Sequence, residues 1–549
     1  MKSSIRILSI LIVLVLKSLS GNVSAQTWQW SSHIGSNQFD ASGHVVVDAQ
    51  GNSYWKGNFD GICYFQNDTS NLVNGDNDFF LAKYNSSGSE LWWKQIGGNN
   101  PSTVGEGIGK IAISQDNYIY MTGGFYGNCN FGSNTLLSNG YTDLFIAKYD
   151  TDGNCMWAVA GGSYGNDVGL GVTLDNAGHV YVCGTNKDTA NISGFILPPG
   201  GFIAKYDTSG NCIWAKKKIS SYQLGFIGTF CSAAPQSIKF NNNLLTISGY
   251  FSHDTVVIDT TIIYSRMLYY FLATFDTSGA LKWVKTFGGP QGGSLNYEHA
   301  IDSHGNIYIT GTSTGQGYFQ TDTLVGPYTA FVVKIDSTGT EQWVRGITSN
   351  NGSWGNMVSS DGDGNVYVTG KFRGNTTFGN FNITSTTISD MFIARYNSSG
   401  DCLGVRFFGE AEGFGVTQDN NGNAYVCGNF SNTITIGSNT YTSYGDKDIF
   451  IAKLDELVGI GDTRQENNQL LIYANPTAGK CTITIPDALK NEKDLWLTLF
   501  DNTGRQISSQ KITDSEGKII INLEQEAKGI YNVSLSNSKI TYYGKIVFE

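Results

Sequence analysis

The sequence predicts an all-β protein, a seven-bladed β-propeller closed by its own N-terminal strand and followed by a small C-terminal β-sandwich. The first observation is composition: the 549 residues include 68 glycines, 29 tyrosines, 30 phenylalanines and 11 tryptophans but only 8 prolines, which is typical of many short strands joined by glycine turns. The second is a strand motif that recurs seven times. The third is a different strand motif, which is missing after the seventh copy and stands near the N-terminus instead.

The first 25 residues have the features of a secretory signal peptide. Lys2 and Arg6 precede an apolar run from residue 7 to residue 16, and the small residues at 23–25 suit cleavage by signal peptidase. A run of this length covers about 15 Å as a helix, half of the roughly 30 Å hydrocarbon core, and is too short for a membrane anchor. No other apolar stretch is long enough to cross a membrane, so we expect no transmembrane segment in the mature chain.

The recurring strand motif has the form Phe-Ile-Ala-Lys and is followed in most copies by Tyr-Asp and a glycine turn. A second motif, a tyrosine in six copies with a glycine shortly after it, runs in step with the first. Both motifs occur seven times, and the first recurs every 57 to 69 residues. The copies of the first begin at Phe80, Phe145, Phe202, Phe271, Phe331, Phe392 and Phe450, and those of the second at Tyr54, Tyr120, Tyr181, Leu245, Tyr308, Tyr367 and Tyr425.

Each repeat contains two strong turn signals. Residues 302–306, Asp-Ser-His-Gly-Asn, lead into one strand, and residues 206–210, Tyr-Asp-Thr-Ser-Gly, lead towards another. In both, an aspartate opens the turn with its side chain and a glycine takes positive φ at the end. Short connections of this kind make antiparallel hairpins, and two hairpins in about sixty residues match one propeller blade.

The two ends of the array indicate how it closes. A third type of strand, usually bearing tryptophan, follows six of the seven Phe-Ile-Ala-Lys segments, with Gly404 in place of the indole in the sixth. The seventh segment lacks such a strand, whereas residues 30–35 copy residues 92–97 in register. This N-terminal strand should therefore lie beside Ile451 and complete the last blade, an offset that an open solenoid would not need.

Residues 26–457 resemble the bacterial SBBP family of β-propeller repeat proteins. The resemblance rests on the signatures DxxGNxYxxG and FIAKYDxxG, which most copies contain and which together span the array. It implies a seven-bladed propeller and says little about chemistry, because propellers carry unrelated functions.

A different module follows the array. Residues 458–467 have the glycines and mixed charges of a linker, and residues 468–549 contain about six or seven short β segments, which suggest a small sandwich. The motifs and their order resemble the sorting domain of type IX secretion cargo; an ordinary adhesive sandwich domain is the alternative. The residues that carry the resemblance are Asn475, Pro476, Gly479, Gly529, Tyr531 and Lys545.

The resemblance to a sorting domain implies a partner and a location. The C-terminal domain would engage the type IX secretion machinery after the chain has entered the periplasm. The protein would then be secreted or attached to the outer-membrane surface.

Charge and cysteine usage exclude some functions. The formal net charge is −11, and losing the three cations of the leader takes it to −14, which argues against a nucleic-acid partner. Nine cysteines is an odd count, and several occupy equivalent positions of different repeats, so we expect most to be small core residues. The spacings typical of a structural zinc site are absent from the sequence.

No motif predicts catalysis or a firm cofactor. Residues 161–165 fit the pattern GxSxG, but no helix follows, as a nucleophile elbow would require. Asp361 and Asp363 resemble the first half of a calcium loop, yet the later glycine and glutamate of such a loop are absent. We therefore favour a hairpin turn at this site, with calcium as the weaker alternative.

The irregular part of the array is a better candidate for a binding site. Between the third and fourth repeats the spacing stretches to 69 residues, and function in repeat scaffolds often lies where loops depart from the consensus. The candidate ligand-binding residues are Lys216, Tyr222, Phe226 and Phe230, and a tolerated surface insertion is the alternative interpretation.

Three functions are compatible with the sequence. The leading hypothesis is a non-enzymatic, secreted or cell-surface scaffold whose propeller binds a protein or glycan through loops on one face. The second is a secreted hydrolase or lyase that acts on polysaccharide or peptide with carboxylates in the central channel. The third is a passive structural component of the cell envelope.

Overall fold

The computed structural model divides the chain into two compact units, residues 1–461 and residues 462–549. The predicted leader and most of the predicted linker lie outside the residues that the structure describes. Those residues are 28–70, 78–98, 109–222, 233–251, 255–264, 269–287, 298–457, 459–460, 470–486, 489–490, 494–501, 506–512, 517–537 and 541–549.

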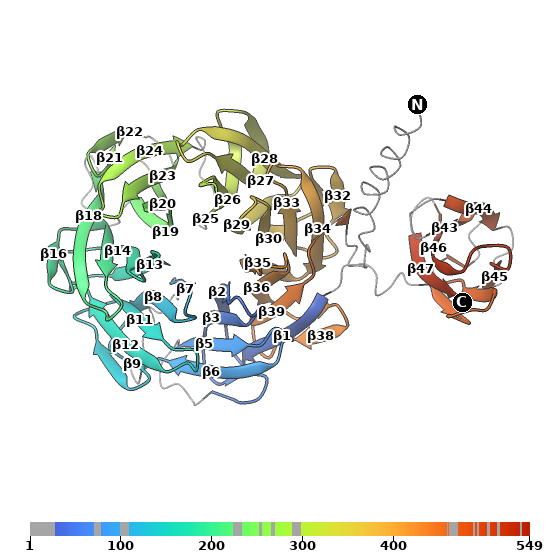
Figure 1. Cartoon of the computed structure of the whole chain (residues 1–549), viewed down its shortest axis with the longest axis horizontal. Coiled ribbons are helices and arrows are strands. Elements are labelled where there is room, and N and C mark those ends of the chain that lie inside the picture. The colour runs from blue at the N-terminus through green and yellow to red at the C-terminus, as the bar shows by residue number, and fades with distance from the viewer. Residues whose placement is uncertain are drawn as a thin grey trace, which may run out of the picture. The chain divides into compact units, whose positions relative to one another are not determined.

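The described part of the first unit is built from seven sheets, each containing four antiparallel strands. Figure 1 shows these sheets arranged around a common centre. The innermost strands are β2 (Ala41–Val47), β7 (Ile111–Ile113), β13 (Asp167–Leu174), β19 (Ala233–Asn241), β25 (His299–Ile301), β29 (Ser353–Ser360) and β35 (Ala411–Gln418). The second strands are β3 (Ser53–Phe59), β8 (Ile119–Phe125), β14 (Val180–Asn186), β20 (Leu244–Phe251), β26 (Ile307–Tyr318), β30 (Val366–Phe372) and β36 (Ala424–Phe430).

The remaining two strands of each sheet lie farther from the centre. The third strands carry the Phe-Ile-Ala-Lys motif and are β5 (Asp78–Tyr84), β11 (Asp143–Tyr149), β17 (Gly200–Tyr206), β23 (Tyr269–Asp276), β27 (Thr323–Ile335), β33 (Asp390–Tyr396) and β39 (Asp448–Leu454). The outermost strands are β6 (Glu90–Ile96), β12 (Cys155–Gly161), β18 (Cys212–Tyr222), β24 (Leu281–Phe287), β28 (Glu341–Ser349), β34 (Cys402–Gly409) and, in the seventh sheet, β1 (Trp28–Ser36).

The repeat motifs hold the second and third strands in register. Tyr54 pairs with Lys83 across the two strands, and the Lys83 ammonium lies 5.0 Å from the centre of the Tyr54 ring. The Tyr54 hydroxyl donates a hydrogen bond to one carboxylate oxygen of Asp48, whose other oxygen accepts from backbone N–H groups of its own turn. The motif residues therefore fix a turn and a strand pair together. The same tyrosine-to-aspartate bond recurs at Tyr181, Tyr308 and Tyr425.

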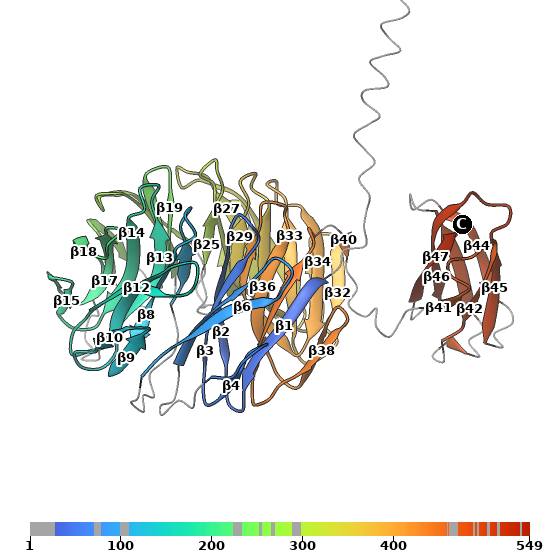
Figure 2. The same ribbon diagram turned by 60° about the horizontal axis from the view of Figure 1, so that its bottom comes forward.

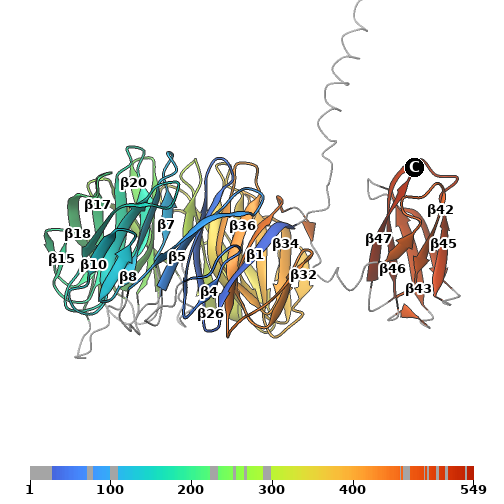
Figure 3. The same cartoon turned by 90° about the horizontal axis from the view of Figure 1, so that it is seen from below.

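The innermost strands contact one another in sequence order around the centre. Strand β2 contacts β7, β7 contacts β13, and so on through β19, β25, β29 and β35, which in turn contacts β2. The turned views show the strands running between the two faces of this assembly (Figure 2 and Figure 3). Side chains of the innermost strands from sheets far apart in the sequence are thus brought to one place.

Strand β1 lies beside the seventh Phe-Ile-Ala-Lys strand, as the sequence predicts. It runs antiparallel to β39, with Ser32 opposite Ile451 and Trp30 opposite Lys453. At its other end, Gly35 and Ser36 pair with β4 (Cys63–Tyr64), which belongs to the first repeat. The N-terminal strand is therefore bonded to both the last repeat and the first.

Tryptophans of the outermost strands bridge each sheet to the next. The Trp30 indole N–H donates to the backbone oxygen of Ser86 at 3.1 Å, and the Trp92 indole donates to that of Thr151 at 3.0 Å. Each acceptor lies in the turn between the third and outermost strands of the following sheet. The N-terminal strand therefore makes the same contact as its copies inside the array. The bond recurs at Trp157, Trp283 and Trp343.

Short strands between the second and third strands add further contacts between repeats. In the fourth repeat, β21 pairs with β18 of the third sheet, and in the sixth, β31 pairs with β28 of the fifth. Strand β40 (Gly459–Ile460) pairs with β34. The other short strands are β9 (Asn128–Phe131), β10 (Asn134–Leu137), β15 (Ala190–Ile192), β16 (Phe195–Leu197), β21 (Thr255–Ile258), β22 (Thr261–Tyr264), β31 (Asn375–Phe378), β32 (Phe381–Thr384), β37 (Thr433–Ile436) and β38 (Asn439–Thr442).

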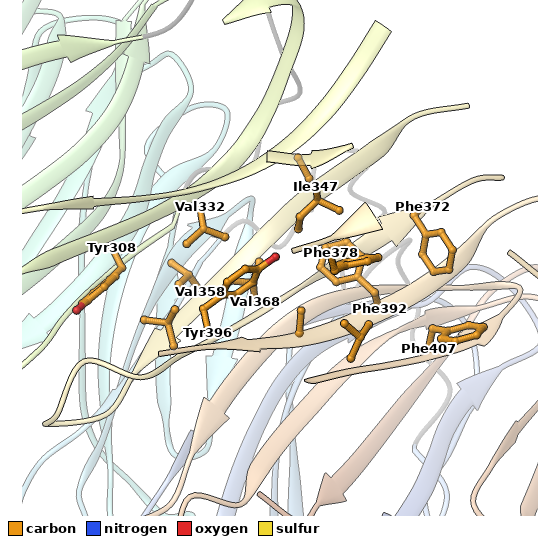
Figure 4. Close-up of a cluster of buried hydrophobic side chains, with 14 of the residues drawn as sticks. Tyr308, Val332, Ile347, Val358, Val368, Phe372, Phe378, Phe392, Tyr396 and Phe407 are labelled. Atoms are coloured by element: carbon orange, nitrogen blue, oxygen red, sulfur yellow. The ribbon is translucent and has the colours of Figure 1, made fainter. Parts of the chain in front are cut away.

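Buried side chains fill the space between neighbouring sheets. Between the fifth and sixth sheets, Tyr308 and Val332 pack with Val368, Phe392 and Tyr396, and each of these side chains is at most 1% exposed (Figure 4). Burying one such side chain stabilises a fold by about 1.5–3 kcal/mol. Comparable clusters join the first sheet to the second, the second to the third and the sixth to the seventh.

Cysteines contribute to this packing. All eight described cysteines are free thiols, five buried and three partly buried. Cys183 and Cys427, which occupy the same position in two repeats, are both core residues. The expectation that most cysteines are small core residues is confirmed for the described part of the chain.

The second unit consists of two sheets that share one buried core. Ile483 and Ile521 of one sheet pack with Leu497 and Val533 of the other, the layout of a small sandwich. The first sheet has the order β41 (Leu471–Tyr473), β42 (Lys480–Thr484), β45 (Lys518–Asn522), and the second has the order β44 (Gln506–Ile512), β43 (Leu495–Phe500), β46 (Gly529–Ser536), β47 (Thr541–Phe548).

Substitution of Gly88 tests the contact between the first and last repeats. Gly88 has a φ of 85°, and a Cβ there would lie 2.5 Å from the Trp30 ring, whereas Gly194 has a φ of 98° and open space around its Cβ. Gly88→Ala should destabilise the protein by about 1–3 kcal/mol more than Gly194→Ala, because only the former forces the indole away. Chemical denaturation of both variants measures this difference, and equal losses would contradict the contact.

Candidate functional site

The ligand-binding residues predicted from the sequence lie on or after strand β18. The Lys216 ammonium donates to the backbone oxygen of Ser278 at 2.6 Å and lies 5.2 Å from the centre of the Trp214 ring. Tyr222 pairs with Thr255 at the end of the strand. Lys216 thus joins the third sheet to the fourth. Phe226 and Phe230 lie outside the described residues, so the four-residue binding site stays a prediction.

The aspartates considered for calcium lie in a hairpin turn. One carboxylate oxygen of Asp361 accepts from the backbone N–H groups of Asp363 and Asn365 at 2.9 and 2.8 Å, and the other accepts from the Asn365 side-chain amide at 2.8 Å. Asp361 therefore stabilises its own turn, as do its counterparts. Among the described residues, no group of three or more His, Cys, Asp or Glu side chains is placed to hold a metal ion.

The serine of the GxSxG sequence also has a local structural role. The Ser163 hydroxyl donates to the Asp167 carboxylate at 2.7 Å and accepts from the backbone N–H of Gly165 at 3.1 Å. Strand β13 begins at Asp167 directly after this loop. Ser163 is thus part of the connection between two sheets.

Polar side chains with the chemistry of a binding site meet where the innermost strands converge. Four sheets supply them, and the residues lie between 44 and 299 in the sequence. We call this group the central cluster. It consists of His44, Lys56, Lys110, Ser237, Lys239, Glu298 and His299.

Most residues of the central cluster occupy the same structural position in their repeats. It lies on or directly before the innermost strand, opposite the residue that precedes the repeat's glycine: His44 is opposite Lys56 and Ser237 is opposite Ser248. Lys110 accepts from Thr122 in the same way through its backbone oxygen. In other repeats the same position holds Gly171, Met357 and Gly415. The structural position is constant, and its chemistry varies from repeat to repeat.

Glu298 is the hub of the cluster. Its carboxylate forms an ion pair with Lys110, a second with Lys239 at 3.2 Å, and accepts from the Ser237 hydroxyl at 2.5 Å. Lys110 also donates to the backbone oxygen of Gln236 at 2.9 Å. Because Lys110 comes from the second repeat, Gln236 from the fourth and Glu298 from the fifth, the Lys110 side chain must reach across the centre.

The two lysines that hold Glu298 remain accessible to solvent. The side chains of Lys110 and Lys239 are 22% and 31% exposed, whereas that of Glu298 is 3% exposed. The carboxylate is therefore enclosed, whereas the two lysine side chains are partly exposed.

Burial shifts the pKa values of the basic groups downwards. It lowers the pKa of Lys56 and of Lys110 to about 7 and that of Lys239 to about 8, and the charge of Lys239 adds to the effect at Lys110. The pKa values of His44 and His299 fall well below their usual value, first through burial and then through the charges of Lys239 and Lys110. Both imidazoles are therefore neutral at pH 7.

Three imidazole nitrogens of the cluster lack a hydrogen-bond partner among the described residues. They are both ring nitrogens of His44 and Nε2 of His299. Nδ1 of His299 lies 2.8 Å from the Ser248 hydroxyl. His44 is 6% exposed and His299 is fully buried. Buried polar groups in proteins are almost always hydrogen-bonded, so these nitrogens mark a place where a further group is needed.

The central cluster could not be predicted from local sequence patterns because its members are far apart in the chain. A signal was nevertheless present, since the residue at one register position changes from glycine or methionine to histidine, lysine or glutamate. Comparing that position across the repeats would have identified His44, Lys110 and Glu298.

Two of the sorting-motif residues, Asn475 and Lys545, contact each other in the second unit. The Asn475 amide donates to the backbone oxygen of Lys545 at 2.6 Å, and its oxygen accepts from the backbone N–H of Val547 at 2.8 Å. Pro476 follows Asn475 directly. The structure therefore joins the first motif of the module to its last strand.

The other motif residues shape the second unit locally. The Tyr531 hydroxyl donates to the backbone oxygen of Ala527. Gly479 and Gly529 have φ values of 147° and 156°. A Cβ at Gly479 would meet the Glu524 side chain at 2.8 Å, whereas none of the described atoms lies within 4 Å of one at Gly529.

The fold and the C-terminal module together define an exported protein built on a β-propeller. A family model described as "Secretion system C-terminal sorting domain" matches residues 471–549. The chain therefore ends in such a sorting domain, which indicates export by type IX secretion, and the resemblance seen in the sequence is confirmed. In the part of the chain that the structure describes, no helix has the length and apolar character needed to cross a bilayer.

Relatives of the remaining chain are distant. An uncharacterized WD repeat-containing protein of Acanthamoeba polyphaga mimivirus is 23% identical over 452 residues, covering 65% of this chain and 32% of that protein. Regulatory protein FlaEY of Caulobacter vibrioides is 25% identical over 146 residues, covering 25% of this chain and 15% of that protein. The chain thus spans less than a third of the length of either relative.

Solved structures that match this chain include one described as a propeller. The Dos1 propeller matches with a TM-score of 0.37 and 9% identity, covering 80% of this chain and 97% of that chain. The GH43 endo-arabinanase of Bacillus licheniformis matches with a TM-score of 0.25 and 12% identity, covering 56% of this chain and all of that chain.

The pH dependence of stability tests the environment of Lys56. Its pKa is about 7 in the folded protein and about 10.5 when unfolded, so between these values the unfolded state binds more protons. The free energy of unfolding should therefore rise as the pH increases from 7 to 10, and Lys56→Met should reduce that rise and be more stable than wild type at pH 7.

Denaturant titrations at several pH values measure this effect. The matched control is Lys285→Met, which changes an exposed lysine of the same unit and should follow the wild-type pH profile. An unchanged profile for Lys56→Met would contradict the low pKa.

Proposed function

We propose that this chain is an exported, seven-bladed β-propeller, closed by its N-terminal strand, that binds a ligand at the central cluster. Closure is supported by the contact of β35 with β2 and by the pairing of β1 with both β39 and β4. A leader at residues 1–25, passage through the periplasm and a final place in the medium or on the cell surface agree with the sorting domain. Membership of the SBBP family of repeat proteins belongs to the same proposal.

The observation that carries the binding role is the shared contact of Lys110 and Lys239 with Glu298. These side chains come from three repeats, and nothing in the packing of a regular repeat requires the charges of Lys110 and Glu298, because other repeats hold glycine or methionine at their position. A binding site explains their convergence. A protein or glycan that approaches one face of the propeller would reach these lysines, while surrounding loops would supply further contacts.

A second candidate function is a lyase. Burial brings the pKa values of Lys110 and Lys239 to about 7 and about 8, which suits a general base at neutral pH. Hydrolysis of a glycosidic bond would require a pair of carboxyl groups, and the central cluster contains one, Glu298. Proton abstraction by lysine is therefore the better supported reaction of the two.

A ligand panel separates binding from catalysis. Immobilised neutral and acidic glycans and surface proteins would be tested with the wild type and with Lys239→Met, with Lys285→Met as the matched control on an exposed strand. We expect saturable binding that falls about tenfold or more in Lys239→Met, the consequence of losing one charge-assisted contact. Turnover of a bound glycan by the wild type, lost in Lys239→Met, would favour the lyase. No binding and no turnover would favour a passive envelope role.

Truncation tests the role of the second unit. The chain would be cut after residue 461. This truncation retains the hydrogen bond from the Leu457 N–H to the Tyr367 hydroxyl and the pairing of β40 with β34. In a host with type IX secretion, the truncated chain should accumulate in the periplasm while the full chain reaches the surface or the medium. Cell fractionation measures this, and delivery of the truncated chain to the surface would contradict the sorting role.

A further inference from the structure

We propose that the ligand of the central cluster carries an oxyanion, a carboxylate, sulfate or phosphate group, and that the site takes up a proton when it binds. This inference rests on the proposed binding function and adds its chemistry. The oxyanion would come from a free small anion or from an acidic saccharide.

The charge balance of the cluster favours an anion. Two ammonium groups, those of Lys110 and Lys239, share the single carboxylate of Glu298. Glu298 can balance only one positive charge. An oxyanion beside the exposed sides of Lys110 and Lys239 would balance another, whereas a metal cation would be repelled.

The hydrogen-bonding groups of the cluster also favour an anion. A neutral imidazole has one N–H donor and one acceptor nitrogen. His44 leaves both of its ring nitrogens without a described partner, and its side chain is more than nine-tenths buried. An oxyanion has several acceptor sites and would accept from the imidazole N–H group as well as from the ammonium groups. A hydroxyl of a neutral sugar offers no charge to match the lysines.

The low pKa values of the lysines couple binding to protonation. Lys110 and Lys239 form ion pairs with Glu298, interact with Cys183, and act on the neighbouring His44 and His299, while the charge of Lys239 also lowers the pKa of Lys110. Burial raises the pKa of the Cys183 thiol to about 12, so it is neutral near pH 7. A bound anion would raise the lysine pKa values, and the site would therefore bind protons along with the anion.

The sign of the pH dependence follows from this linkage. Below pH 7 both lysines are already charged, and binding needs no additional proton. Above the free-state values of about 7 and 8, the lysines must be protonated for the anion to be held, so affinity should fall as the pH rises from 7 to 9.

Calorimetric titration of the full-length mature protein tests the inference. The probes are sodium sulfate, sodium phosphate, glucuronate and an oligogalacturonate, with glucose as the neutral control. We expect at least one oxyanion to bind, with affinity about tenfold lower in Lys239→Met, unchanged in Lys285→Met, and lower by about tenfold or more at pH 9 than at pH 7. Binding of the inorganic ions would assign a small free anion, and binding of the saccharides alone would assign an acidic glycan.

Further variants and ligands distinguish a failure of the oxyanion inference from a failure of the binding function. Lys239→Arg keeps the positive charge and should retain binding if Lys239→Met loses it, which excludes a folding defect as the cause. A neutral glycan or protein that binds in a Lys239-dependent way, without any oxyanion binding, would overturn the oxyanion inference and leave the binding function intact. Oxyanion affinity that is equal in Lys239→Met or independent of pH would also overturn it.

Discussion

The tryptophan that leaves one sheet and hydrogen-bonds to the next is the contact on which the rest of the first unit depends. Its indole gives a sheet-to-sheet bond at a fixed place, and its ring occupies the space that a turn glycine leaves open, as Trp30 does at Gly88. A four-stranded sheet has two apolar faces that must both be covered. The indole sets how neighbouring sheets lie over one another, and the buried clusters between them supply most of the free energy.

That outer contact leaves the inner edge of the sheets free to vary. The position occupied by His44, Lys110 and Glu298 makes no contribution to the contacts between outermost strands, and glycine or methionine suffices there in other repeats. A repeat protein can therefore change the chemistry at its centre without changing its scaffold. Burial at the centre then changes how these groups titrate, because it lowers the pKa values of lysines that would otherwise be strongly basic.

The sequence allowed most of the fold to be predicted and little of the site. Asp48, Tyr54 and Lys83 are local in the chain, so a motif search finds the turns and strand pairs that they hold together. The pairing of β1 with β39 was also predictable, because a tight turn leaves a missing strand that only the N-terminal copy can supply. The ion pair of Lys110 with Glu298 joins residues 188 apart, and no local pattern records which residues of different repeats face one another. The unpaired ring nitrogens of His44 could not be predicted for the same reason.

The pairing of strand β1 with β39 constrains the order in which the chain can fold. Strand β1 is synthesised before the rest of the array, and its partner β39 lies more than 400 residues later, as the contact between His33 and Asp448 shows. Closing so long a loop is slow and can only follow synthesis of the whole array. The first strand is therefore the last to dock, and an emerging chain keeps its first and last repeats unjoined.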